Sequence, residues 1–516
     1  MHIFCIVQYM NLPVPPDVSE LMRVREPRTR ANSGALRKRL RSARDYETWA
    51  KIAQELDVLS GRELWKQRVK SNQYDYAMVG RRLDEFRTLR ALGDVRGLVF
   101  AIEEGVHGNL GGMGKPSLFN RARFGTKQQI VEFVDEVCKV LSIIEAIPDE
   151  QMTLNEKLDL FGRASHCYGR SALMMSSGGT LMYFHFGVAK SLFERGVLPN
   201  VISGSSAGGI VAAALGTHTD EELGSFFTAE NLHFGEAWEP NFLERTTGLR
   251  RMFKADVFDQ IFERLIPDMT FREAFQLSGR NISISVSPCE RHQRPRLLNA
   301  VTAPHVLIRS AVRASCAVPG IFEPVQLLAR DAHGKTVPYL KARWIDGVFA
   351  ADLPAKQLGR LYGTNHYIVS YINPVLMPAF RDAPGRKNRL KPLTTMLKGA
   401  AQDFVKSADV VLGKYLPAST LGAANKVVHD LLSQDYVGDI NIAPHQRLVS
   451  PFKLLSPNTL EEISDLVLEG ERQTWPKIEM IRISGLISRE LDQILARCER
   501  RKRAAPGLRF PPVKSQ

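Results

Sequence analysis

Long apolar runs are missing from this sequence of 516 residues, and its six cysteines form no recognisable pattern. Without a run of 18 apolar residues, no helix is expected to span a bilayer. The cysteines show no CxxC and no ligand-like spacing to histidine, which argues against a zinc site and against a disulfide framework. Met1–Leu12 is too short for a secretory leader and lacks its basic start. We therefore expect a cytoplasmic protein that is not secreted and holds no metal.

Positive charge is unevenly distributed along the chain, whose formal net charge is +14. Between Arg23 and Arg44 there are nine Lys or Arg and one acid, Glu26, and a second basic cluster runs from Arg497 to Arg503. Such runs are typical of solvated arms, and the alternative is contact with anionic lipid head groups or nucleic acid. No aromatic residues are interleaved with these cations, and no nucleic-acid-binding motif is visible, so no nucleic acid partner is expected.

The composition divides the chain into five parts. Prolines at positions 13, 15, 16 and 27 indicate an arm without regular structure at the start. The expected parts are a basic arm (1–44), a helical N-terminal domain (45–165), an α/β domain (166–375), a mostly helical C-terminal extension (376–500) and a basic tail (501–516). In the extension, the apolar helix expected over 394–415 follows a basic loop. It would either pack on the sheet or dock on a lipid surface.

Short strands and helices alternate after about residue 165. Strands are expected at 172–175, 198–203, 281–286, 338–345, 366–372 and 436–442, and helices at 186–196, 209–215, 304–317 and 354–362. Strands that alternate with helices predict a mostly parallel sheet covered on both faces.

The most informative stretch runs from Val201 to Leu215. An apolar, β-branched lead-in ends in Gly204-Ser-Ser-Ala-Gly208, and a helix of small residues follows. This is the pattern of a nucleophile elbow, a tight strand-to-helix turn that exposes one serine. Gly204 and Gly208 let the backbone close around Ser206, and the helix N-terminus favours negative charge nearby. The sequence therefore predicts a serine hydrolase with Ser206 as its nucleophile.

A serine nucleophile needs a base and an oxyanion hole. Gly178-Gly179 follows a strand and precedes a helix, so backbone N–H groups there could face the serine. One candidate base system is a triad of Ser206, Asp346 and His366. However, His366 precedes its strand, whereas Asp346 follows one and should share the edge of Ser206. This favours a dyad in which Asp346 takes the proton of Ser206 directly, although a solvated aspartate is a weak base.

Three motifs together carry a family resemblance. Ser176-Ser-Gly-Gly-Thr180, Gly204-Ser-Ser-Ala-Gly208 and Asp346-Gly347, in this order, resemble the patatin-like phospholipases. The match is closer to the triacylglycerol-lipase branch, which has an additional helical N-terminal domain. Further similar stretches are Trp65–Tyr76, His185–Ala189, Leu298–Val306, Ala314–Phe322 and Gly438–Ile440.

The resemblance implies a three-layer α/β fold with a mostly parallel sheet, flanked by helical regions at both ends. It implies a Ser206–Asp346 dyad, an oxyanion hole at Gly178, Gly179 and Thr180, and no cofactor. Two positions depart from the pattern. Leu181, Met182 and Tyr183 follow the glycines where many patatins have a basic residue, and Val348 follows Asp346-Gly347. The first departure leaves oxyanion stabilisation to backbone groups.

The expected reaction is hydrolysis of acyl esters in neutral glycerolipids or phospholipids, most simply triacylglycerol. Alternatives are a phospholipase or lysophospholipase, an acyltransferase on the same site, and a lipid-surface scaffold without activity. An acyltransferase HxxxxD motif is absent, because Lys190 follows His185 and Tyr371 follows His366 at that offset. His185 is expected to hold the glycine turn. Contact with a membrane or lipid-droplet surface would be peripheral.

Overall fold

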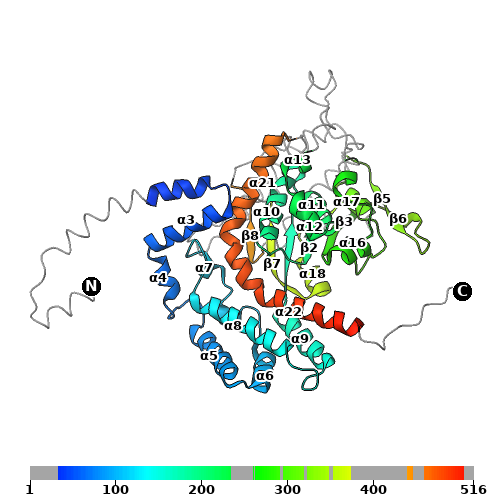
Figure 1. Ribbon diagram of the computed structural model, residues 1–516. Coiled ribbons are helices and arrows are strands. Elements are labelled where there is room, and N and C mark those ends of the chain that lie inside the picture. The colour runs from blue at the N-terminus through cyan, green and yellow to red at the C-terminus, as the bar shows by residue number, and fades with distance from the viewer. Residues whose placement is uncertain are drawn as a thin grey trace, which may run out of the picture.

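A mixed sheet forms the centre of the chain after residue 170. In the computed structural model (Figure 1), eight strands form one sheet in the order β5-β6-β3-β2-β1-β7-β8, with β4 also paired to β3. The strands are β1 (Arg170–Met175), β2 (Val201–Gly204), β3 (Asn281–Pro288), β4 (Arg296–Asn299), β5 (Val325–Arg330), β6 (Thr336–Asp346), β7 (Thr364–Ser370) and β8 (Ile440–Ile442). The structure describes residues 33–233, 260, 262–290, 294–318, 322–347, 352–372, 438–445 and 458–504.

The middle of the sheet is parallel, as the alternation of strands and helices predicts. β1 pairs in parallel with β2 and β7, β2 with β3, and β7 with β8. β4 and β6 run antiparallel to β3, and β5 is antiparallel to β6. All residues from Ala172 to Met175 are buried, as expected for a central strand covered on both faces. The fold is therefore α/β, with a mostly parallel sheet and an antiparallel side beyond β3.

Helices cover both faces of the sheet. Leu173 and Met175 point into a large core with helices on one face, whereas Ala172 and Met174 pack with α18 on the other. The helices of this region are α10 (Met182–Glu194), α11 (Ala207–Gly216), α12 (Asp220–Phe226), α13 (Ala229–Leu232), α16 (Phe271–Ser278), α17 (Ile308–Ser315) and α18 (Ala355–Tyr362), with the short 3-10 turn η2 (Gly179–Leu181) ahead of α10. α11 packs on β2 and β3, so the segment after β2 is fixed against the sheet.

The N-terminal region is helical, as its periodicity predicts. Its elements are α3 (Tyr46–Leu59), α4 (Arg62–Gln67), α5 (Tyr76–Leu92), α6 (Val95–Gly105), η1 (Leu110–Gly112), α7 (Pro116–Phe119), α8 (Gln128–Glu145) and α9 (Leu154–Tyr168). α9 ends directly before β1, and one hydrophobic cluster runs without a break from Val79 to the sheet. The helical region and the sheet therefore share a core.

Two C-terminal helices complete this core. α21 (Leu460–Thr474) packs along α10, and after the turn η7 (Trp475–Lys477), α22 (Ile478–Ala504) packs on α8, α9 and β1 (Figure 1). α22 thus joins the N-terminal helices to the sheet. The helix expected at 394–415 and the basic loop before it lie outside the described residues.

Three expectations differ from the structure. β4 and β5 are strands that the sequence pattern did not indicate, and both belong to the antiparallel side of the sheet. Residues 33–42 form a helix inside the stretch expected to be an irregular arm, and α22 continues to Ala504, into the expected tail. The prolines that indicate an irregular arm all precede this helix, so they do not prevent it from forming. Among the described residues, no helix combines the length and apolarity needed to cross a membrane.

Candidate active site

Ser206 occupies a strained turn between β2 and α11. Its backbone has φ 51° and ψ −115°, a conformation that non-glycine residues rarely adopt. Ser206 is partly exposed, whereas the residues on both sides of it are buried. The turn therefore presents one serine side chain at the N-terminus of α11, as predicted from the sequence.

The elbow needs its glycines because backbone atoms fill the space around it. A Cβ on Gly204 would overlap the carbonyl of Gly208, and a Cβ on Gly208 would overlap the carbonyl of Met175. The Ser205 N–H also donates to the Met175 carbonyl, at 3.3 Å. The elbow is thus packed against the carboxyl end of β1, from which the glycine loop starts.

Asp346 reaches the same edge of the sheet by an unexpected route. β2 pairs with β3 as far as Ile284, where its partner is Gly204. Val286, two residues further, has Arg296 of β4 as one partner and Asp346 of β6 as the other. β6 therefore continues the line of β2 beyond Gly204 but runs in the opposite direction. Asp346 therefore lies at the edge expected from the sequence, although its strand is antiparallel to β3.

The end of α17 connects the serine to the aspartate. Ser206 N–H donates to Ser315 Oγ at 2.9 Å, and Ser315 Oγ donates to the Ser285 carbonyl at 2.8 Å. Cys316 follows, and its side chain hydrogen-bonds with that of Ser206. Burial raises the pKa of the Cys316 thiol, and the nearby charge of Asp346 raises it further, against the Ser206 hydrogen bond. Ser206 and Asp346 thus both lie close to one thiol.

The Asp346 carboxyl is itself almost fully buried, with 1% of the residue exposed. Its backbone N–H donates to the Ala317 carbonyl at 3.0 Å, which ties it to the same segment after α17. Gly347 lies against the backbone of Ser285. Removal from water strengthens a carboxylate as a base, as a proton acceptor for serine requires.

Three hydrogen bonds hold the loop that carries the predicted oxyanion glycines. The Ser176 N–H donates to the Ser370 carbonyl at 3.1 Å, and Ser176 Oγ accepts from the Ile372 N–H at 3.0 Å. The Ser177 N–H donates to Asp352 Oδ1 at 2.9 Å. Gly178 and Gly179 come next, and η2, which starts at Gly179, packs against α11. The glycines are therefore brought next to the elbow helix.

The last predicted residue of the oxyanion loop, Thr180, is tied to the C-terminal helices. Its carbonyl accepts a hydrogen bond from Asn458 Nδ2 at 3.1 Å, immediately before α21. Because α21 also packs along α10, the glycine loop is supported by an element almost 280 positions further along the chain.

His185 is a structural residue of this loop, as expected. It is fully buried on α10, where Nε2 donates to the Ser176 carbonyl at 2.9 Å and Nδ1 accepts from Ser370 Oγ at 2.6 Å. Burial lowers its pKa to about 4, against the Ser176 hydrogen bond. The imidazole is thus neutral at pH 7 and fixed in one tautomer.

The alternative base, His366, lies at the other end of the sheet. It is on β7 opposite Ser171, and its Nδ1 is 3.0 Å from Ser171 Oγ. Ser171 is four residues before Met175, where the elbow packs against β1. About 13 Å of strand therefore separates the position of His366 from that of the elbow. The structure brings Asp346, and not His366, to Ser206.

Sequence reasoning missed three residues at this site. Ser315 and Cys316 belong to a stretch noted only for its family resemblance, and nothing local indicated their contacts with Ser206. Asp352 was not considered, although it follows Asp346 by six positions. It is 1% exposed, and burial raises its pKa to about 7, against the hydrogen bonds from Ser177.

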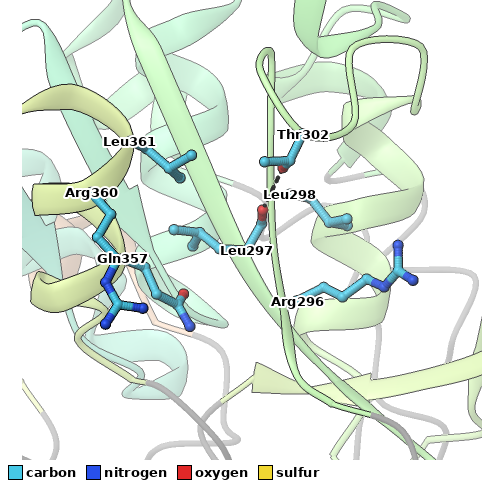
Figure 2. Close-up of a pocket in the computed structure, with 7 residues that line it drawn as sticks. All are labelled: Arg296, Leu297, Leu298, Thr302, Gln357, Arg360 and Leu361. Atoms are coloured by element: carbon cyan, nitrogen blue, oxygen red, sulfur yellow. Dashed lines mark hydrogen bonds between the residues drawn. The ribbon is translucent and has the colours of Figure 1, made fainter.

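A separate pocket of about 370 Å³ lies between β4 and α18 (Figure 2). Leu297 and Gln357 face each other across it, whereas the Arg296 guanidinium points away, 5.7 Å from the centre of the Trp344 ring. Its lining includes no residue of the elbow, the glycine loop or Asp346. It is therefore distinct from the candidate site.

Comparison with known proteins finds one family for the helical N-terminal region and another for the α/β region that follows it. Residues 173–358 match the family Patatin-like phospholipase, and residues 27–166 match a family described as Domain of unknown function (DUF3336). The first match contains the elbow, the glycine loop and Asp346. The second contains the helices from α3 to α8 and most of α9.

Curated relatives match most of this chain. Triacylglycerol lipase SDP1L of Arabidopsis thaliana is 32% identical over 91% of this chain and 60% of its own length. Triacylglycerol lipase ptl3 of Schizosaccharomyces pombe is 32% identical over 85% of this chain and 92% of its own length. Triacylglycerol lipase ptl2 of the same yeast is 31% identical over 88% and 74%. The chain therefore spans most of the yeast proteins but less than two thirds of the plant protein.

Among solved structures, VipD from Legionella pneumophila matches at 15% identity with a TM-score of 0.26, over 58% of this chain and 67% of that chain. This score is too low to inform the fold. The sequence relatives are decisive, because two of them exceed 30% identity over most of their own length. The chain belongs to the patatin-like phospholipase family and carries a DUF3336 domain ahead of its patatin-like domain.

Proposed function

We propose that this chain hydrolyses acyl esters of lipids through a dyad of Ser206 and Asp346, with triacylglycerol as its main substrate class. The observation that carries the proposal is the strained, partly exposed Ser206. Its side chain hydrogen-bonds with that of Cys316, and the charge of Asp346 raises the pKa of the same thiol. Strained serines on such turns are typical of acyl-transfer nucleophiles. The names of ptl3, ptl2 and SDP1L support triacylglycerol as the substrate.

In the proposed mechanism, Ser206 Oγ attacks the ester carbonyl while Asp346 accepts the hydroxyl proton. Backbone N–H groups of Gly178, Gly179 and Thr180, together with the N-terminus of α11, stabilise the resulting oxyanion. The intermediate collapses, the ester C–O bond breaks, and the leaving alcohol takes the proton from Asp346. Asp346 then takes a proton from water, and the resulting hydroxide attacks the acyl-enzyme carbonyl. The bond between the acyl carbon and Ser206 Oγ breaks, Ser206 Oγ takes the proton back from Asp346, and the fatty acid is released.

Phospholipid is the second candidate substrate, because residues 173–358 match a family named for phospholipase activity. The same acyl-enzyme would support an acyltransferase if an alcohol replaced water in the second step. Both substrates lie in a lipid phase, so we propose that the chain works in the cytoplasm in peripheral contact with a membrane or lipid-droplet surface. No nucleic acid or organic cofactor has a part in this mechanism.

The test is mass-spectrometric product analysis on emulsions that contain both triacylglycerol and phospholipid. Ser206→Ala and Asp346→Asn should each abolish fatty-acid release, whereas Ser205→Ala, one position away, should retain it. The ratio of the two product sets in the wild type identifies the substrate class, and new esters in place of free fatty acid identify an acyltransferase. Full activity of Ser206→Ala would refute the nucleophile. Activity retained in Asp346→Asn but lost in His366→Ala would replace the dyad with a triad.

A further inference from the structure

The turn between α3 and α4 exposes a cluster of aliphatic side chains. Ser60 and Gly61 join the two helices, and Val58 at the end of α3 is 62% exposed. Leu64 on α4 is 69% exposed, and Val69, just past α4, is 50% exposed. Single exposed aliphatics are normal on protein surfaces, but several around one tight turn indicate an interaction site.

Cations from separate segments gather around the same turn. Burial lowers the pKa of Arg123, and the charges of Arg62 and Arg37 lower it further, against Asp57. Burial also lowers the pKa of Lys127, and Arg121 and Arg68 add to this effect. Like charges that depress one another's pKa lie close together and repel. Hydrogen bonds place these segments together, because the Arg123 and Phe124 N–H groups donate to Asp57 and Lys127 Nζ donates to the Trp65 and Arg68 carbonyls. Cations from separate segments therefore lie close to this turn.

Acidic groups at this turn are already engaged. Asp57 is fully buried and accepts hydrogen bonds from the backbone N–H groups of Arg123 and Phe124, each at 3.0 Å. Lys66 Nζ lies 3.5 Å from Asp57 and 2.8 Å from Glu63. Arg123 Nη1 also lies 3.8 Å from Asp57. These two carboxylates therefore pair with Lys66, Arg123 and the backbone, and Arg37, Arg62 and Arg68 remain available to an outside anion.

The helix at residues 33–42 extends the positive patch. Leu40 and Ala43 anchor it in a cluster with Trp49 and Trp475. Its outer side borders an open hollow of about 540 Å³, lined by Gly34, Arg37, Lys38, Arg41 and Ser42. Phe124 packs in the same cluster as Leu40 and Ala43, and its N–H donates to Asp57, so the helix that lines the hollow lies near the α3–α4 turn.

We propose that this surface docks the chain on an anionic phospholipid surface. We call it the α4 corner and define it by the exposed aliphatics Val58, Leu59, Leu64 and Val69 and the cations Arg37, Arg62 and Arg68. The aliphatics enter the interface between head groups and acyl chains while the cations pair with lipid phosphates. Docking deepens the proposed function and rests on it, since it brings the enzyme to substrate held in a lipid phase.

The position of the α4 corner suits an anchor. α4 lies at the outer edge of the N-terminal helices, on the opposite side of the molecule from β5 and β6 (Figure 1). Its residues take no part in the elbow or the glycine loop. The α4 corner can therefore hold the chain on a surface without occupying the site, which gives the helical N-terminal domain a specific role.

Vesicle flotation tests this proposal with the full chain carrying Ser206→Ala, so that the lipid is not consumed. We expect binding to phosphatidylcholine vesicles that contain phosphatidylserine, weakening as salt rises, and little binding to phosphatidylcholine alone. Replacing Arg37 and Arg68, two cations of the α4 corner, with Gln should lower partitioning about 25-fold, since each cation near an anionic surface contributes about fivefold. Val58→Ser with Leu64→Ser should lower it about tenfold or more.

Matched substitutions elsewhere serve as controls. Val301, just after β4, is 60% exposed, and Leu92, the last residue of α5, is 75% exposed. Neither belongs to the α4 corner, so Val301→Ser with Leu92→Ser should leave flotation unchanged. In the chain with Ser206 intact, the α4-corner variants should hydrolyse a soluble short-chain ester at the wild-type rate. They should lose activity only on lipid surfaces.

Three results would overturn the docking proposal: unchanged flotation of the α4-corner variants, an equal loss in the control variant, or equal binding to uncharged vesicles. Dimerisation through the α4 corner without vesicle binding would assign the surface to a second copy of the chain instead. Failure of the catalytic proposal is separately visible, because it appears as soluble-ester activity that survives Ser206→Ala.

Discussion

The backbone N–H of Ser206 donates to the hydroxyl of Ser315, 109 positions further along the chain, at 2.9 Å. Ser315 in turn donates to the Ser285 carbonyl, next to the residue that pairs with Asp346. One buried hydroxyl thus fixes the strained residue of the elbow relative to the strand beside the proposed base. Strain of this kind persists only where the surroundings hold it in place.

Ser315→Ala should therefore lower kcat more than it raises KM. It removes the partners of two buried backbone groups, each of which costs about 1–3 kcal/mol when left unsatisfied. Ser310→Ala is the matched control, since Ser310 is buried on the same helix and donates to the Leu307 carbonyl at 2.8 Å. Thermal unfolding and soluble-ester kinetics should show similar destabilisation for both, with kcat reduced only for Ser315→Ala. An equal loss of kcat would show that Ser315 acts only through stability.

Gly208→Ala and Gly209→Ala should have opposite effects, although the two glycines are adjacent. A Cβ on Gly208 overlaps the Met175 carbonyl, and forcing atoms into a packed site costs about 1–3 kcal/mol or more. A Cβ on Gly209 would have its nearest neighbours at 3.6 Å, and alanine favours the helix by up to about 1 kcal/mol. Urea unfolding of both variants measures the difference, and similar midpoints for the two would contradict the packing described for the elbow.

His185 should make the stability of the protein fall as the pH drops below about 6.5. The folded chain keeps this imidazole neutral until its pKa of about 4, whereas the unfolded chain takes up a proton near pH 6.5. Between these values the unfolded state binds more protons, so stability rises with pH, by roughly 3 kcal/mol across the window. The difference in unfolding free energy between wild type and His185→Gln, measured by chemical unfolding from pH 4 to 7, should rise with pH across this window. Parallel curves would contradict a neutral, buried His185.

Asp352 should act in the opposite direction. Its folded pKa of about 7 exceeds the ordinary 3.8, so the folded state keeps a proton that the unfolded state loses. Stability from this group therefore declines as pH rises from about 4 to about 7. Asp352→Asn cannot ionise and should remove this decline, measured as the difference from wild type in chemical unfolding. An unchanged pH slope in Asp352→Asn would mean that Asp352 is ionised in the folded chain.

The same aspartate should also position the glycine loop. Asp352→Asn keeps an oxygen that accepts from the Ser177 N–H, whereas Asp352→Leu does not. We therefore expect soluble-ester kcat to be retained in Asp352→Asn and reduced in Asp352→Leu, with KM nearly unchanged in both. Equal activity of the two variants would show that this hydrogen bond does not support the loop.

The elbow and the N-terminal helices could be predicted because local patterns encode them. Gly204 and Gly208 surround Ser206 within five residues, and the requirement for small residues arises from the turn itself. Apolar residues at helical spacing predict helices at 46–57, 84–92, 94–105 and 126–146. The bounds of α3, α6 and α8 lie within a few residues of these, whereas α5 starts eight residues earlier than expected. The elbow motif and the helical spacing of apolar residues both lie in residues that are close together in the sequence.

The route of Asp346 to the site was decided only by the tertiary structure. The pattern over 338–345 indicates a strand but not its partner or its direction, so β6 could be predicted as an element and not as antiparallel. β4 and β5 were not predicted because their own sequences do not indicate strands. They become strands by pairing with β3 and β6.

The sequence alone thus determined which serine is exposed and which glycines surround it, because a turn is formed by neighbouring residues. The fold alone decided that Ser315 and Cys316 contact that serine, and that Asp346 reaches its edge of the sheet on an antiparallel strand. It also decided that Asp352 accepts a hydrogen bond from the glycine loop and that cations from three segments lie near α4. These contacts join residues far apart in the chain, and only the packing of a complete core brings such residues together.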